Sequence, residues 1–221
     1  MKTSIIKILQ QVAYLFIPYL LALSACLIIG VIFSKAQIYF TVNSWHFDFG
    51  DTFFALWTNM GDGIVVILLS VILALFSYRK GFLMLSSYAI TSLLAQLLKR
   101  IVRTPRPVIF FKEQAAKMYL VKGVAMLETL SFPSGHTVSA FSAGIVLTYI
   151  TPRRSWGLLF FVLAVLVGYS RMYLSEHFFE DVVGGSVIGV LVTVIWLSYI
   201  DGKAFIHSPK WQRGLLTSRK A

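Results

Sequence analysis

The sequence predicts an all-α integral membrane protein, a bundle of six transmembrane helices with one short external helix at the membrane surface. Of its 221 residues, 57% are hydrophobic, and the mean hydropathy is +0.78. A water-soluble domain of this size is not so apolar, and about 20 apolar residues cross a bilayer core. No repeat or change in composition divides the chain, so we interpret residues 1–221 as one domain.

Six apolar runs are the expected membrane spans. They cover residues 12–34, 62–78, 82–98, 136–151, 156–170 and 182–200, and the fifth helix is expected to be short. The first run continues through Phe33, which is too long for the core of a signal peptide, so we expect an uncleaved helix. Cys26 is the only cysteine, so neither an intrachain disulfide nor a cysteine metal cluster is expected.

The basic residues predict the orientation of the bundle. An even number of spans puts both termini on one side, where eleven basic residues meet one acid, Asp201, while nine basic residues on the other side meet eight acids. A basic excess marks the cytoplasmic side, so we expect cytoplasmic termini. Scattered over short turns and a tail, these residues do not predict nucleic-acid binding. The eleven are Lys2, Lys7, Arg79, Lys80, Arg153, Arg154, Lys203, Lys210, Arg213, Arg219 and Lys220.

Residues 35–61 form the first external segment and mix aromatic with acidic residues. We expect a short helix here that lies on the membrane surface with its aromatic side chains in lipid. His46 has no partner at motif spacing and is interpreted as an interfacial histidine. The aromatic residues expected to enter lipid are Phe47, Phe53, Phe54 and Trp57.

Residues 108–130 are the longest stretch outside the expected spans. Helix-forming residues between Glu113 and Val121 favour a short surface helix that covers a pocket or shapes a lipid entrance, and a plain connector remains the alternative.

The last apolar run contains closely spaced glycines. Gly184, Gly185 and Gly189 are expected to let this helix approach the fourth one closely, which we prefer to a dimer contact. The chain is therefore expected to be a monomer or a weak homodimer. The expected partners on the fourth helix are Ala140, Ala143 and Gly144.

The stretch SFPSGHTVSAFS, from Ser131 to Ser142, has features of a phosphate site. A proline and a glycine precede a small-residue apolar run, so Ser134, Gly135 and His136 fall at the start of a helix. Free N–H groups and the positive end of the helix dipole meet there, which suits an anion. His136 adds a group that can release a proton near neutral pH.

Two further sequence blocks support a functional interpretation of this stretch. In KRIVRTPRP, six residues separate Lys99 from the pair Arg106-Pro107. In SRMYLSEHFFED, five residues separate the pair Ser170-Arg171 from His177, and three separate His177 from Asp181. The three blocks resemble the signature of the type 2 phosphatidic acid phosphatase (PAP2) superfamily at every signature position. The resemblance runs from residue 99 to 181, and the flanking helices fit the membrane-bound bacterial branch.

Cleavage of a phosphate ester needs charge neutralisation, an in-line nucleophile and a proton for the leaving oxygen. Lys99, Arg106 and Arg171 can neutralise the phosphoryl oxygens, and the arginine fork suits them well. Ser134 and the backbone N–H of Gly135 can complete this cradle.

The two histidines take different roles in this interpretation. His177 and Asp181 share one face if the last helix begins before them, so the carboxylate can orient the imidazole as a nucleophile. His136 is then the general acid and later the base for water. The resemblance implies the same roles. Glu176 and Glu180 are interpreted as solvated external residues.

A metal site built from His136, His177 and Asp181 is the rival interpretation. Three neighbouring cations would repel a divalent ion, so we expect neither a metal nor another cofactor. Structural ion pairs alone do not explain so many charges at one membrane face.

We therefore expect a hydrolase of lipid phosphates, working through a phosphohistidine at the periplasmic face of a bacterial inner membrane. Among the substrates that the resemblance implies, undecaprenyl diphosphate is favoured over phosphatidylglycerol phosphate, phosphatidic acid and lipid A phosphates. Two alternatives stay open: a lipid-to-lipid phosphotransferase, and a non-catalytic lipid-binding or transport protein of the same fold.

Overall fold

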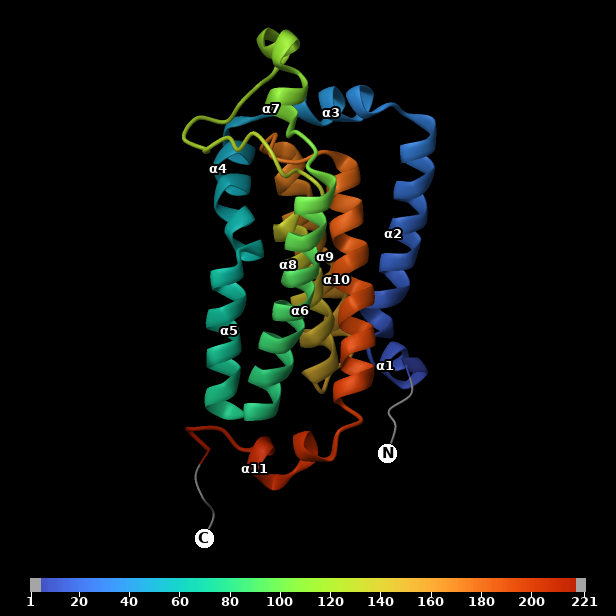
Figure 1. The fold of residues 1–221 in the computed structure, drawn as a ribbon, viewed down its shortest axis with the longest axis vertical. Coiled ribbons are helices and arrows are strands. Elements are labelled where there is room, and N and C mark those ends of the chain that lie inside the picture. Colours follow the sequence, from blue (N-terminus) through green and yellow to red (C-terminus); the bar gives the residue numbers. More distant parts are fainter. Residues whose placement is uncertain (1–4, 218–221) are drawn as a thin grey trace.

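The computed structural model describes residues 5–217, which form helices and connecting segments without a strand. The long helices stand side by side as an elongated bundle (Figure 1). They are α2 (Ala13–Ile32), α5 (Gly63–Phe76), α6 (Tyr78–Val102), α8 (Gly135–Ile150), α9 (Trp156–Tyr173) and α10 (Phe179–Ile200). The shorter elements are α1 (Ile5–Gln11), α3 (Lys35–Asn43), α4 (Asp48–Trp57), α7 (Pro107–Phe110), α11 (Pro209–Gln212) and the 3₁₀ turns η1 (Thr58–Gly61), η2 (Lys112–Lys117) and η3 (Ala204–His207).

Each expected apolar run coincides with one long helix, and several of these helices can cross a membrane. By length and composition α2, α9, α10 and the α6–α7 stretch qualify, and α4 with α5, bent by 56°, would be a fifth span. The protein is thus a multi-pass membrane protein, while the count of six spans stays a prediction. The fifth helix, expected to be short, has 18 residues in α9 and is longer than α8, with 16, and α5, with 14.

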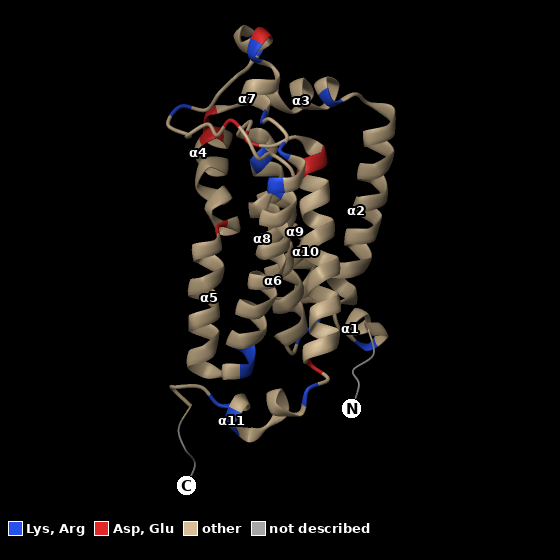
Figure 2. Cartoon of the chain, in the orientation of Figure 1, with Lys and Arg blue, Asp and Glu red and all other residues tan. Residues whose placement is uncertain are grey.

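The outer surface of the bundle is apolar. Leu21 of α2, Ile64 of α5 and Leu93 of α6 are 70%, 66% and 73% exposed. Such a belt would drive a water-soluble protein to aggregate, but it is the surface that acyl chains solvate. Charged residues gather at the two ends of the bundle, and the region between them carries few (Figure 2).

Close contact between α10 and α8 positions the site, as the glycines predicted. A Cβ atom on Gly185 would lie 2.7 Å from the carbonyl oxygen of Ser134, and one on Gly189 would lie 2.7 Å from that of Val138. The contacts fall nearer the start of α8 than expected, and Gly144 faces α2 and α9 instead. The lack of a side chain at Gly185 and Gly189 therefore lets α10 approach the N-terminal part of α8 closely.

This contact predicts a stability effect. Gly189→Ala should lower the free energy of unfolding by roughly 1–3 kcal/mol, because a backbone carbonyl of α8 cannot move aside for the methyl group. The measurement is thermal unfolding in detergent. Gly30→Ala in α2 is the control, since its Cβ would meet only the Phe179 ring at 3.8 Å. Equal midpoints for both variants would contradict the packing argument.

Helix directions alternate, so α1 and α11 lie at one end of the bundle and α3 and α7 lie at the other (Figure 1). At the α1–α11 end, Arg79 Nη2 donates to Asp201 Oδ1 at 2.8 Å and to the Tyr149 hydroxyl at 3.1 Å. The one acid expected at this end thus neutralises a basic residue. Which end faces the cytoplasm stays a prediction, and Lys2, Arg219 and Lys220 lie outside the described residues.

The first external segment differs from expectation. It forms two helices, α3 across the end of the bundle and α4 leading into α5 (Figure 1). Phe54 packs on Tyr169 and Tyr173 of α9, with ring centroids 5.1 and 4.6 Å apart. This side chain is therefore directed at the bundle, because α4 runs beside α9.

His46 also has partners that its sequence neighbourhood did not reveal. Its Nδ1 lies 2.9 Å from Asp51 Oδ1, and its ring lies between those of Tyr119 and Tyr173. Asp51 also accepts hydrogen bonds from both tyrosine hydroxyls, at 2.6 and 2.7 Å. This cluster joins residues 35–61 to the 108–130 segment and to α9, which carries Arg171.

Candidate active site

Lys99 and Arg106 of the first sequence block are both buried at the α7 end of the bundle. Lys99 lies in the last turn of α6, and its Nζ donates to the carbonyl oxygens of Leu130, at 2.5 Å, and Ser131, at 3.4 Å. Arg106 directly precedes α7, where its Nε donates to the carbonyl oxygen of Thr129 at 3.0 Å. These bonds attach the first block to the chain just before the second.

The second block starts α8 as predicted, with Ser134 as the N-cap. Ser134 Oγ accepts from the backbone N–H of Thr137 at 3.4 Å and from its hydroxyl at 2.9 Å. Its own O–H proton thus stays available for another acceptor. Gly135 faces open space, since a Cβ there would meet nothing within 4 Å. His136 follows in the first turn.

The third block supplies a buried histidine and carboxylate. His177 Nδ1 lies 3.5 Å from Asp181 Oδ2, which accepts from Ser131 Oγ at 2.5 Å and from the Phe178 N–H at 2.8 Å. The condition for a shared helix face, that the last helix begins before His177, is not met, because α10 begins at Phe179. A connecting turn, not helical spacing, presents the imidazole to the carboxylate.

That turn has an unusual backbone. Ser175 has a φ of +57°, a left-handed conformation that costs a non-glycine residue energy. It is held by Tyr39, whose hydroxyl lies 2.9 Å from Ser175 Oγ, and by Asn43 Nδ2 at 3.1 Å. The backbone N–H groups of Glu176 and His177 then both donate to the carbonyl oxygen of Arg171. The turn therefore directs these two side chains inward.

Glu176 corrects the sequence interpretation most clearly. It is 4% exposed, not solvated, and its Oε2 forms ion pairs with Arg106 Nη1 and, at 3.3 Å, with Arg171 Nη2. Glu180 behaves nearer to expectation, since it is partly exposed and pairs with Lys35 at 2.6 Å.

Arg171 belongs to the last turn of α9 and is buried. Its Nη1 donates to the hydroxyl of Thr58 in η1 at 2.5 Å, while its buried Nε has no hydrogen-bond partner among the described residues. Ser170, the other member of this signature pair, donates to the carbonyl oxygen of Val167 within α9 at 2.7 Å. Ser170 is thus structural here, whereas Arg171 retains a free donor.

The surroundings shift the pKa values of His177 and Glu176, the two titratable side chains of the turn. Burial, and then the charges of Arg106, Arg171, Lys99 and His136, hold the pKa of His177 well below its usual range, so the ring is neutral at neutral pH. Burial raises the pKa of the Glu176 carboxyl, against the effect of Arg171 and Arg106.

Direct bonds therefore join the three sequence blocks. Besides Lys99 to Ser131 and Arg106 to Glu176, the backbone N–H of Ser134 donates to the carbonyl oxygen of Asp181 at 3.0 Å. Ser131, Thr58 and Glu176 were missed as members of the site. No sequence signal marked Thr58, while Ser131 and Glu176 lie inside the quoted blocks at positions that the signature does not fix.

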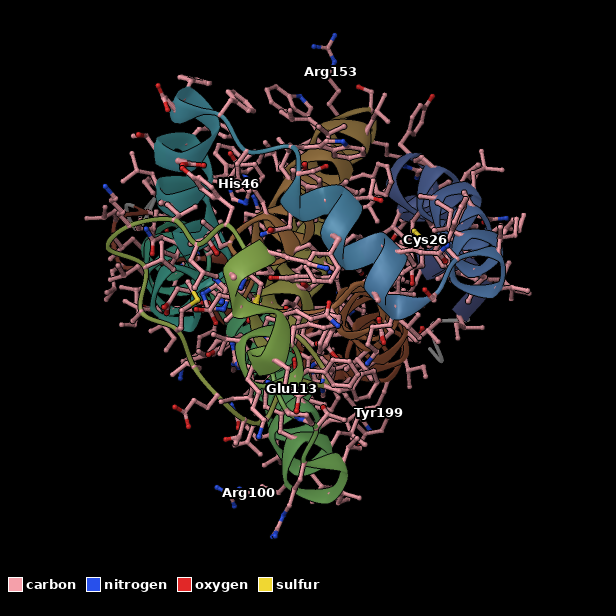
Figure 3. All side chains as sticks on the ribbon, turned by 90° about the horizontal axis from the view of Figure 1, so that it is seen from above. Cys26, His46, Arg100, Glu113, Arg153 and Tyr199 are labelled. Carbon is pink, nitrogen blue, oxygen red and sulfur yellow. The ribbon has the colours of Figure 1, made fainter. Side chains whose placement is uncertain are left out.

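Residues 108–130 lie over this end of the bundle, as seen from above in Figure 3. The expected helix is only the short η2, and the segment then continues without regular structure. Tyr119 anchors it, because its backbone N–H and carbonyl group both bond to the Asn43 amide, at 2.9 and 2.8 Å. Val121 is buried against Tyr173 and Leu174. The segment is thus fastened over the helix ends that carry the site.

Comparisons with known proteins place the chain in a family. Residues 80–204 match the PAP2 superfamily. Phosphatidylglycerophosphatase B of Bacillus subtilis is 32% identical over 149 residues, covering 61% of this chain and 68% of the relative. Undecaprenyl-diphosphatase BcrC of Bacillus subtilis is 31% identical over 71 residues, 32% of this chain and 36% of the relative. The crystal structure of Aquifex aeolicus LpxE matches with a TM-score of 0.66 and 29% identity, over 74% of this chain and 94% of that one.

Helices suited to a bilayer and a buried cation cluster suited to phosphate define a membrane-bound lipid phosphatase. The family match covers more than half of the sequence and includes all three blocks. The chain belongs to the PAP2 superfamily, in its bacterial membrane branch.

Proposed function

We propose that this phosphatase cleaves lipid phosphates through a phosphohistidine on His177, at the external face of a bacterial inner membrane. The contact between His177 Nδ1 and Asp181 Oδ2 carries the proposal, since it leaves Nε2 of a neutral ring free to attack. Lys99, Arg106 and Arg171, with Ser134 and the Gly135 N–H, receive the phosphoryl oxygens. Charge on these oxygens is thereby neutralised by side chains.

The first step forms a bond between His177 Nε2 and phosphorus and breaks the bond from phosphorus to the lipid-side oxygen. His136 donates its proton to that leaving oxygen. In the second step His136 takes a proton from water, whose oxygen attacks phosphorus and releases inorganic phosphate and neutral His177. Asp181 stabilises the positive charge that His177 gains on attack.

An apolar cavity beside the site supports a lipid substrate. It has a volume of about 160 Å³ and lies between α5, α8 and α9. Trp57 and Val167 line it. Trp57 directly precedes Thr58, and Val167 lies about one helical turn before Arg171 in α9. The first part of an apolar tail would reach this cavity while its phosphate lies in the cradle.

We favour undecaprenyl diphosphate as substrate, supported by the relative BcrC, whose name gives that activity. The name of the other relative, phosphatidylglycerophosphatase B, supports phosphatidylglycerol phosphate as the second choice. Phosphatidic acid and lipid A phosphates complete the panel of test substrates. Transfer of the phosphate to a second lipid would indicate a phosphotransferase.

Purified protein in detergent should release inorganic phosphate from this panel in excess EDTA, because side chains perform every step. The measurement is phosphate release with each lipid, with and without chelator. Loss of turnover on chelation, restored by a divalent ion, would contradict the mechanism. If no lipid released phosphate, lipid binding would be favoured over hydrolysis. If the phosphate appeared on a second lipid, transfer would be favoured instead.

A further inference from the structure

Glu176 lies where the proposed function places the substrate phosphate. Its Oε2 contacts Arg106, which follows α6, and Arg171, which ends α9. Both arginines are buried, and so is the carboxylate. A negatively charged oxygen between two guanidinium groups is the arrangement that a phosphate oxygen would adopt.

The hydrogen bonds of these two arginines do not form a closed network. The carboxylate therefore occupies a position between the guanidinium groups that another anion could take, which we call the phosphate seat. Thr129, Thr58 and the backbone carbonyl of Glu176 take further donors of the two guanidinium groups. Arg171 Nε, however, is buried without a partner among the described residues. A buried guanidinium donor left unpaired is costly, and an arriving oxyanion would satisfy it.

We propose that Glu176 is an internal counterion, which occupies the seat between Arg106 and Arg171 when no phosphate is bound and which a phosphate must displace. This inference rests on the proposed function for the identity of the lipid substrate. The displacement of Glu176 by a phosphate anion does not depend on that function. Two buried guanidinium groups repel each other, and the carboxylate stabilises them while the seat has no other anion. Its displacement opposes binding of every phosphate species, including the inorganic phosphate released by the second step.

Glu176→Gln tests the counterion directly, because the amide keeps the shape of the side chain and removes its charge. The affinity for inorganic phosphate should rise roughly ten-fold, seen as a lower inhibition constant against lipid substrate and as tighter binding in calorimetry without lipid. The KM should fall with it, and kcat should fall if phosphate release becomes limiting. Glu180→Gln is the matched control, a carboxylate of α10 that pairs with Lys35 and should leave phosphate affinity unchanged.

A purely structural role predicts the opposite result. If Glu176 only held the arginines in place, the glutamine variant would bind phosphate more weakly or equally well, and either outcome would overturn the proposal. Should that variant fail to fold, Glu176→Asp keeps the charge on a shorter side chain, and it too should bind phosphate more tightly than the native protein. Calorimetry separates this inference from the proposed function, because it needs no turnover. If Glu176→Gln bound phosphate more tightly but no lipid were hydrolysed, the counterion role would be supported and only the proposed activity would be rejected.

Discussion

His177→Ala is expected to abolish phosphate release, lowering kcat by about 10⁴-fold or more. The reason is that the proposed mechanism forms its first covalent bond on this imidazole, and that no second histidine contacts Asp181 in the described part of the chain. The measurement is phosphate release from the preferred lipid of the panel. His207→Ala at the opposite end of the bundle is the matched control, because its ring is half exposed and bonds to Asp201.

The neighbouring histidine should behave differently. His136→Ala removes the proposed proton donor but leaves the proposed nucleophile, so turnover should slow by about 10²–10⁴-fold. The loss should be smaller in the first step for a lipid diphosphate, whose leaving phosphate needs less protonation than an alkoxide. Equal and complete loss of the first step in both variants would contradict the division of roles.

Asp181→Asn is expected to have the second largest effect, a fall in kcat on the order of 10³–10⁴-fold with little change in KM. This carboxylate contacts His177, Ser131 and the Phe178 N–H, and not the proposed phosphate seat. An amide cannot stabilise the charge that His177 gains in the proposed attack, and it favours the wrong tautomer of the ring. The measurement is steady-state kinetics, with thermal unfolding to confirm folding.

Asp48→Asn is the control for this variant, since Asp48 is exposed in the first turn of α4. It should retain native kinetics. If Asp181→Asn raised KM and left kcat unchanged, Asp181 would belong to phosphate binding instead of orienting the nucleophile.

The sequence predicted the parts of this site that depend on local geometry. The start of α8 at Ser134 followed from a proline, a glycine and an apolar run, which act over a few residues. The close approach of α10 to α8 followed from the spacing of glycines. The pairing of His177 with Asp181 was also expected, although it arises from a turn and not from a helix face.

The missed features depend on contacts between distant parts of the chain. Glu176 looks solvated in sequence because its partner Arg106 lies 70 residues away, and Thr58 lies 113 residues from Arg171. His46 seemed isolated because two of its contacts come from Tyr119 and Tyr173. No periodicity or propensity encodes such pairs, since they are fixed only once the helices have packed.

The central claim, a phosphohistidine on His177, is tested most directly by trapping it. Native protein and the His136→Ala and His177→Ala variants would be mixed with ³²P-labelled lipid diphosphate and quenched rapidly in alkaline denaturant, because phosphohistidine is labile in acid. We expect label on the peptide containing His177 in native protein, longer-lived label there in His136→Ala, and none in His177→Ala. Label that persists in His177→Ala and is missing from His136→Ala would contradict this mechanism and reverse the two roles.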